Sequence, residues 1–226
     1  MTKNRARFAS ARRINQSITA GVEKRILVWM AERAPAWLTS DQLTVLGLGA
    51  QIGAGICYGL ARYDRRALVL VIVCIALNWV GDSLDGTLAR VRQQQRPRYG
   101  FYVDHVVDMF GSIALMCGLG CSGLVHWPVA IGMLLGFMLL ASESFLATHT
   151  LGCFQMSQGM FGPTEIRILL IVGNLALLRN PYATLLGHRM LLFDLGGGIA
   201  CVVMFAMAIV VTLRHTVELY REEPLP

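Results

Sequence analysis

Two pairs of aspartates have helical spacing within apolar stretches of this sequence. Asp82 and Asp85 are three residues apart, and Asp104 and Asp108 are four apart, so each pair projects from one face of its helix. An unpaired carboxylate in the centre of a membrane helix costs roughly 2.5–3.5 kcal/mol, so four cost on the order of 10 kcal/mol. Because no Lys or Arg lies within either pair, bound cations are the simplest way to remove this cost.

The ligand atoms of such a site indicate its chemistry. All-oxygen ligands favour hard ions, so we expect Mg²⁺ or Mn²⁺, and two ions could clamp the attacking and leaving oxygens of a displacement. Magnesium held by carboxylates commonly completes its shell with substrate phosphates, which indicates phosphoryl chemistry on a nucleotide or diphosphate. Gly86, directly after Asp85, leaves room for such a group to approach the backbone, and Gly100 does the same on the facing helix.

The segment from Asp82 to Asp108 resembles the signature of the CDP-alcohol phosphotransferase (CDP-alcohol phosphatidyltransferase) family. That signature is DxxDGxxAR, followed after eight or nine residues by GxxxDxxxD, and every fixed position is present here with a gap of nine. The resemblance implies six transmembrane helices, a homodimer, and a role in phospholipid biosynthesis. It also implies transfer of a substituted phosphoryl group from a CDP-linked alcohol donor to an alcohol acceptor, with release of CMP.

The resemblance further implies roles for individual residues. The metal would be held by Asp82, Asp85 and Asp104, and Asp108 would complete the site and is one candidate base for the acceptor hydroxyl. The nucleotide would be bordered by Asp82, Asp85, Gly86, Ala89, Arg90 and Gly100. His105 is the second candidate base, because an Asp-His pair at this place is similar to the choline and ethanolamine phosphotransferases. A histidine that only bonds neighbouring helices is the alternative, so the choice of base stays open.

Three residues outside the signature are candidates for binding the head group or acceptor. Glu143 lies inside an expected membrane segment, where a carboxylate is functional by default, and Glu165 opens the next segment, followed by Arg167. A Thr-Glu pair at that place looks like the amino-alcohol branch of the family. We therefore expect an ethanolamine- or choline-type CDP donor and a lipid hydroxyl acceptor. The open alternatives are that Glu165 caps its helix or pairs with Arg167, and that CDP-diacylglycerol is the donor with a polar alcohol as acceptor.

The elements that must position these residues are hydrophobic helices. The chain has 226 residues, of which 55% are hydrophobic and 15% charged, with a mean hydropathy of +0.54, which exceeds what a soluble core of this size can bury. About 20 apolar residues span a bilayer as a helix. We expect an all-α integral membrane protein with six transmembrane helices, at Gln42–Ala61, Ala67–Leu88, Tyr99–Val125, Pro128–Thr148, Pro163–Leu178 and Leu192–Leu213. The two aspartate pairs then lie on adjacent, antiparallel helices.

The pattern divides the chain into a basic N-terminal part, residues 1–38, and a six-helix membrane domain, residues 39–226. Within the first part, Val22 to Ala34 has one apolar face that includes Trp29, which predicts a cytoplasmic interfacial helix. The first 20 or so residues are basic and polar, a composition typical of disorder.

The distribution of basic residues predicts the orientation. Fourteen Lys and Arg fall on the side of the expected bundle that holds both termini, and five fall on the other side. Because cytoplasmic segments near membrane helices carry the excess of positive charge, we expect cytoplasmic termini and a cytoplasmic active site, in a bacterial inner membrane.

Three other function classes fit the sequence less well. A net charge of +6 could suggest nucleic acid, but the basic residues flank membrane segments, so anionic lipid head groups are the expected partners. An intramembrane prenyltransferase would also hold a diphosphate through magnesium, but its second Asp-rich motif lies far downstream. A divalent-metal transporter would explain the carboxylates without requiring Gly86, Ala89, Arg90 or Gly100.

Overall fold

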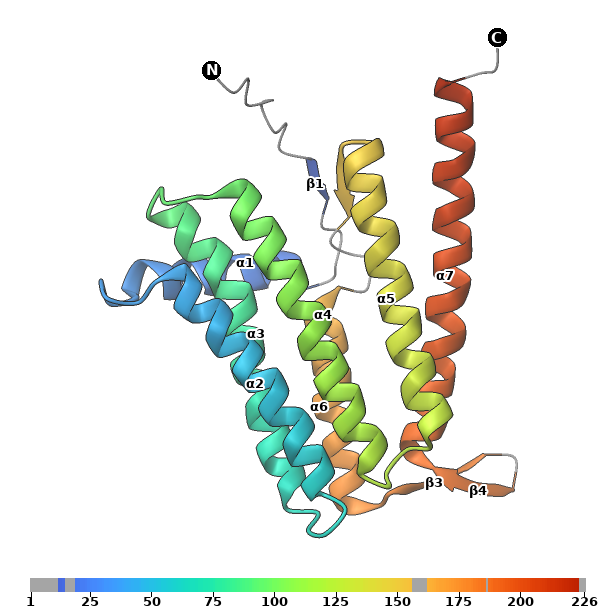
Figure 1. Ribbon diagram of the computed structural model, residues 1–226. Helices are drawn as coiled ribbons and strands as arrows, with labels where there is room; N and C mark the ends of the chain where they lie inside the picture. Colours follow the sequence, from blue (N-terminus) through green and yellow to red (C-terminus); the bar gives the residue numbers. More distant parts are fainter. Residues whose placement is uncertain (1–11, 15–18, 156–161, 186, 224–226) are drawn as a thin grey trace, which may run out of the picture.

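The computed structural model describes residues 12–14, 19–155, 162–185 and 187–223. This part of the chain forms a bundle of helices in which α2 to α7 run alongside one another, and α1 crosses near one end (Figure 1). The helices are α1 (Ala20–Arg33), α2 (Ser40–Leu60), α3 (Ala67–Val91), α4 (Pro97–Cys121), α5 (Trp127–Thr150), α6 (Pro163–Arg179) and α7 (Leu192–Glu222).

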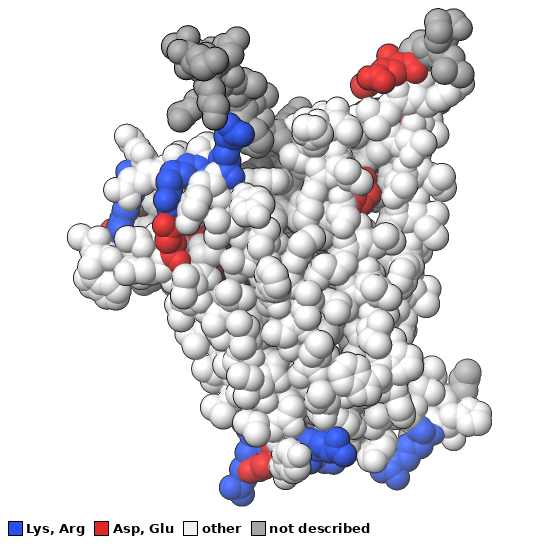
Figure 2. Space-filling view, viewed as in Figure 1, with Lys and Arg blue, Asp and Glu red and all other residues white. Residues whose placement is uncertain are grey.

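Five of the described helices, α2, α3, α4, α5 and α7, are long and apolar enough to cross a membrane. Figure 2 shows Lys and Arg gathered toward the two ends of the molecule, while the middle of this face is mostly uncharged. The sixth expected segment does form a helix, α6, but it has only 17 residues. Pro163 opens α6 and an extended Asn180 ends it, so six membrane spans are not established.

Short strands correct the expectation that the chain is entirely α-helical. After α6, β3 (Tyr182–Leu185) and β4 (His188–Leu191) pair antiparallel, with Gly187 in the connection at a φ of 83° that favours glycine. Near the other end, β1 (Arg12–Ile14) pairs in parallel with β2 (Cys153–Gln155). Both pairs form in segments that connect or precede helices, where the apolar pattern gives no strand signal.

Helix α1 occupies the segment expected to form an interfacial helix. Its buried Leu27 and Ala31 pack with side chains of α2 and α3, whereas Val22 and Trp29 are 63% and 56% exposed. The basic arm before α1 lies mostly outside the described residues. The placement of α1 at a cytoplasmic membrane surface stays a prediction.

Glycines bring α2 very close to its neighbours and so fix the position of α3 and α4. A Cβ atom added at Gly81 of α3 would lie 2.5 Å from the backbone nitrogen of Gly47 on α2, and one added at Gly118 of α4 would overlap the backbone of Gly55. Small residues at a helix interface allow this approach. The helices α3 and α4, which carry the aspartate pairs, are therefore both packed against α2.

Candidate active site

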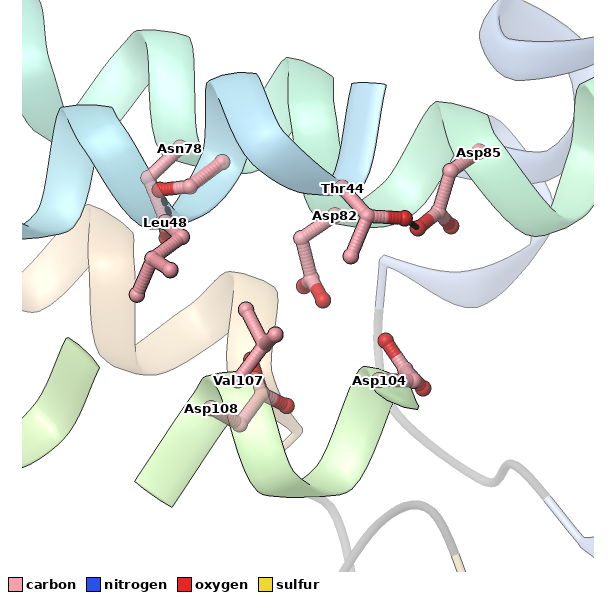
Figure 3. A pocket seen from close by; sticks show the side chains of 9 residues that line it. Thr44, Leu48, Asn78, Asp82, Asp85, Asp104, Val107 and Asp108 are labelled. Atoms are coloured by element: carbon pink, nitrogen blue, oxygen red, sulfur yellow. Dashed lines mark hydrogen bonds between the residues drawn. The ribbon is translucent and has the colours of Figure 1, made fainter. Parts of the chain in front are cut away.

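Three of the four aspartates converge between α3 and α4. One carboxylate oxygen each from Asp82, Asp104 and Asp108 lies within 4.8 Å of the others, and all three residues line one pocket with Val107 and Leu48 (Figure 3). The two helices face each other across this pocket, as expected for the aspartate pairs, but both pack mainly on α2 rather than on each other. Three carboxylate oxygens at this spacing fit a hard divalent cation, which takes oxygen ligands.

Asp85 lines the same pocket but is held apart from the other three carboxylates. Its Oδ2 accepts a 2.6 Å hydrogen bond from the Thr44 hydroxyl of α2, and its Oδ1 accepts from the backbone N–H of Gly86. The spacing of three residues turns Asp85 about 60° around α3 and about 4.5 Å along it relative to Asp82, which directs it toward α2 (Figure 3). A role for Asp85 as a metal ligand stays a prediction.

Arg167 of α6 supplies a positive partner that the spacing of the aspartates does not reveal. Its Nη2 donates a 2.5 Å hydrogen bond to Oδ2 of Asp82, 85 residues away in sequence, and its Nε donates to Oδ1 of Asn78 at 2.9 Å. Its Nη1 is buried and has no hydrogen-bond partner among the described residues. A guanidinium therefore offsets part of the aspartate charge, and bound cations as the remaining partners stay a prediction.

His105 has partners on its own helix and beside the pocket. Its Nδ1 donates a 2.7 Å hydrogen bond to the backbone carbonyl of Phe101, and lies 3.6 Å from Oδ2 of Asp104. The imidazole stacks on the Phe101 ring and meets the Phe145 ring edge-on. Asp108 is among the residues that line the pocket and His105 is not; the choice of base stays a prediction.

The expected nucleotide-binding residues lie where α3 ends and α4 begins. Arg90 is exposed, and its Nη2 donates a 2.8 Å hydrogen bond to the Thr87 hydroxyl. A Cβ added at Gly86 would meet only the Arg90 guanidinium within 4 Å, and one added at Gly100 would meet nothing. Ala89 is half-buried on the same part of α3. This side of the site therefore has open space for a ligand.

The two glutamates proposed for the head group have protein partners of their own. Oε1 of Glu143 lies 2.5 Å from Nδ1 of His215, which joins α5 to α7, and both side chains are largely buried. Glu165 caps α6: its Oε1 accepts from the backbone N–H and hydroxyl of Thr19, and its Oε2 accepts from the N–H of Gly162. The capping alternative for Glu165 is thus the one observed.

Two lining residues with polar side chains, Asn78 and Thr44, were not among the expected site residues. Asn78 precedes Asp82 by one helical turn, and its amide donates to the backbone carbonyl of Gly47; a polar side chain inside an apolar helix was the available signal. Thr44 has no such signal, because a threonine hydroxyl within a helix usually bonds its own backbone. Only the packing of α2 on α3 brings it to Asp85.

Comparison with known proteins identifies a family to which the chain is similar, and a relative. The family model described as CDP-alcohol phosphatidyltransferase matches residues 37–214, which contain the pocket. An uncharacterized protein of Aquifex aeolicus (strain VF5) is 32% identical over 119 residues, which cover 49% of this chain and 57% of the relative. The chain therefore matches little more than half the length of that protein.

Proposed function

The chain belongs to the CDP-alcohol phosphatidyltransferase family, and from that premise we propose that it transfers a substituted phosphoryl group from a CDP-linked alcohol to an alcohol acceptor in phospholipid synthesis. The family supports a transferase with such a donor and acceptor. The single observation that carries the proposal to this pocket is the convergence of Asp82, Asp104 and Asp108 between two helices of a multi-pass membrane protein.

We propose that the three converging carboxylates hold Mg²⁺ or Mn²⁺, with Asp85 extending the site toward the nucleotide and a second ion. A divalent cation bound there would neutralise phosphate charge and stabilise the leaving oxygen. The fit rests on donor type and spacing, since each residue offers an oxygen and the three lie within 4.8 Å of one another.

In the proposed reaction, Asp108 removes the proton from the acceptor hydroxyl. The acceptor oxygen then forms a bond to the phosphorus that carries the alcohol, and the bond from that phosphorus to the oxygen bridging the two phosphates breaks. CMP leaves with that oxygen and its electron pair. Asp108 suits the role because it lines the pocket beside Asp104 and lies within reach of a bound acceptor.

For the donor, we propose a CDP-amino-alcohol of the ethanolamine or choline type, with a lipid hydroxyl as acceptor. The support is the Thr164-Glu165 pair at the start of α6. CDP-diacylglycerol with a polar acceptor is the second candidate. It is favoured by the hydrogen bonds that already engage Glu143 and Glu165, and by the buried Arg167 guanidinium beside the pocket, which suits an anionic acceptor.

The deciding experiment measures CMP release by the purified full-length protein with Mg²⁺ or Mn²⁺. CDP-ethanolamine, CDP-choline and CDP-diacylglycerol would be compared, each with its acceptor, and Asp108→Asn would be compared with Asp64→Asn. Asp64 lies in the exposed connection between α2 and α3, so its variant should keep wild-type activity. Turnover with CDP-diacylglycerol alone would reject the amino-alcohol donor. Cation flux in vesicles without any CMP release would favour a transporter instead.

We also propose a homodimer in a bacterial inner membrane, with both termini and the aspartate pocket on the cytoplasmic side. The support for the orientation is the excess of Lys and Arg on the side of the termini, and the homodimer rests on the family resemblance alone. Cysteine labelling of intact cells tests the orientation. Residues in the connection between α3 and α4 should be protected from an impermeant reagent, and residues in the β3–β4 hairpin should react.

A further inference from the structure

One carboxylate oxygen of α1 connects three helices. Oε1 of Glu23 accepts hydrogen bonds from the Trp79 indole at 3.0 Å and the Ser83 hydroxyl at 3.3 Å, both on α3. The same oxygen accepts a 2.6 Å hydrogen bond from the Thr164 hydroxyl at the start of α6. Since hydrogen bonds to a charged acceptor are stronger than neutral ones, Glu23 is a substantial link between α3 and α6.

This link lies beside the contact between Arg167 and Asp82. Trp79 and Ser83 directly follow Asn78 and Asp82, the two residues that Arg167 contacts. Along α6, Thr164 precedes Arg167 by three residues, so the two side chains lie on one face of the helix. The Glu23 bridge and the Arg167 contact therefore join α3 and α6 at adjacent turns.

A second contact from the same end of α1 fixes the start of α6. The backbone N–H and hydroxyl of Thr19 donate to Oε1 of Glu165 at 2.9 and 2.8 Å. Glu165 in turn holds the first turn of α6 through Gly162. Thus α1 contacts α6 at two consecutive residues, Thr164 and Glu165, close before Arg167.

We propose that Glu23 is a positioning residue for the aspartate pocket, which holds α6 where Arg167 reaches Asp82. A guanidinium on Asp82 competes with a cation for the same carboxylate, so the position of α6 sets the cation affinity of the pocket. The inference rests on the proposed function only in taking this pocket as the cation site. Glu23 acts through Arg167 and touches none of the three converging carboxylates in the contacts described above.

The test is Mn²⁺ affinity, measured by electron paramagnetic resonance on the purified full-length protein. Arg167→Gln removes the competing charge and should tighten Mn²⁺ binding about tenfold. Glu23→Ala should also tighten Mn²⁺ binding, because α6 is released. The loss of a negative charge by itself would have the opposite effect and weaken cation binding. Glu23→Gln keeps an acceptor oxygen for all three donors and should stay within about twofold of wild type.

The double variant Glu23→Ala/Arg167→Gln decides whether the effect passes through Arg167. If Glu23 and Arg167 acted independently, their effects on the free energy of Mn²⁺ binding would add. If Glu23 acts by positioning Arg167, the double variant should bind Mn²⁺ as Arg167→Gln does. Full additivity, or unchanged or weaker binding in Glu23→Ala, overturns the proposal. Thr164→Val, which removes one donor to Glu23, should shift the affinity in the same direction and serves if Glu23→Ala does not fold.

Glu32→Ala, an exposed substitution on the same helix, is the matched control and should leave Mn²⁺ affinity at the wild-type value. The two proposals fail separately in this design. If the wild type releases no CMP from any CDP-alcohol but the Mn²⁺ shifts appear as expected, the proposed function is wrong and the positioning role stands. If CMP is released but the shifts in Mn²⁺ affinity are absent, the proposed function stands and the positioning role of Glu23 is wrong.

Discussion

The hydroxyl of Thr44 on α2 donates a 2.6 Å hydrogen bond to Oδ2 of Asp85 on α3. With the Gly86 N–H on the other oxygen, both oxygens of this buried carboxylate have a donor. The Ser40 hydroxyl also donates to the backbone carbonyl of Asp85, at 3.0 Å. Helix α2 therefore orients part of the pocket without contributing a carboxylate to it.

Thr44→Val should lower the rate of CMP release about tenfold, because Asp85 loses the hydrogen-bond donor that fixes its orientation. A buried acceptor left without its donor costs about 1–3 kcal/mol. Valine has nearly the same volume as threonine, so the packing of α2 on α3 should remain. The measurement is kcat and KM for the CDP-alcohol at saturating Mg²⁺.

Thr216→Val is the matched control for Thr44→Val. The Thr216 hydroxyl donates to the Thr212 carbonyl one turn earlier on α7. The Thr44 hydroxyl makes the same kind of bond to the Ser40 carbonyl on α2, in addition to its bond to Asp85. If both valine variants lose activity equally, the bond to Asp85 is not the cause.

Gly81→Ala should reduce both stability and activity. A Cβ there would lie 2.5 Å from the Gly47 nitrogen, so α2 and α3 must separate, and overpacking of this kind costs about 1–3 kcal/mol. We expect a lower midpoint of thermal unfolding in detergent, together with slower CMP release because Thr44 moves from Asp85. Gly49→Ala on α2, where a Cβ meets no heavy atom within 4 Å, should leave both quantities at wild-type values or above.

The four aspartates should differ in their contribution to cation binding. Asp104→Asn and Asp108→Asn each remove a ligand from the converging group and should weaken Mn²⁺ binding about 100-fold. Asp85→Asn should weaken Mn²⁺ binding about tenfold or less. Asp64→Asn should have no effect. The measurement is Mn²⁺ affinity by titration calorimetry on the folded variants. Equal losses of affinity in Asp85→Asn and Asp104→Asn would mean that Asp85 is a full ligand.

Chelation of divalent cations should abolish CMP release, and added Mg²⁺ or Mn²⁺ should restore it.

His215→Leu should destabilise the contact between α5 and α7. It leaves the Glu143 carboxylate, 13% exposed, without its His215 partner, at a cost of about 1–3 kcal/mol for an unsatisfied buried group. We expect a lower unfolding midpoint with KM for the CDP-alcohol unchanged. The double variant Glu143→Gln/His215→Gln removes the unpaired charge and should recover most of the stability. A raised KM at full stability would instead indicate that Glu143 contacts the head group.

Much of this protein follows from its sequence because the determining signals are local. Apolar runs of about 20 residues predict membrane helices through backbone hydrogen bonding in lipid, and five of the expected spans are present. Their bounds agree within a few residues, except that α7 continues to Glu222. The closeness of the two aspartate pairs likewise follows from the short connection between their helices, although both helices pack mainly on α2.

Long-range contacts required the tertiary structure. Arg167 reaches Asp82 from 85 residues away, Thr44 reaches Asp85 from 41 residues away, and Glu23 connects α3 to α6. None of these pairs has a spacing that a single helix could bring together. The sequence by itself placed the two aspartate pairs on successive helices, because apolar runs and helical spacing are local properties. Only the packing of α1, α2 and α6 around α3 decided which partner neutralises, orients or positions each carboxylate, because that depends on contacts between distant segments.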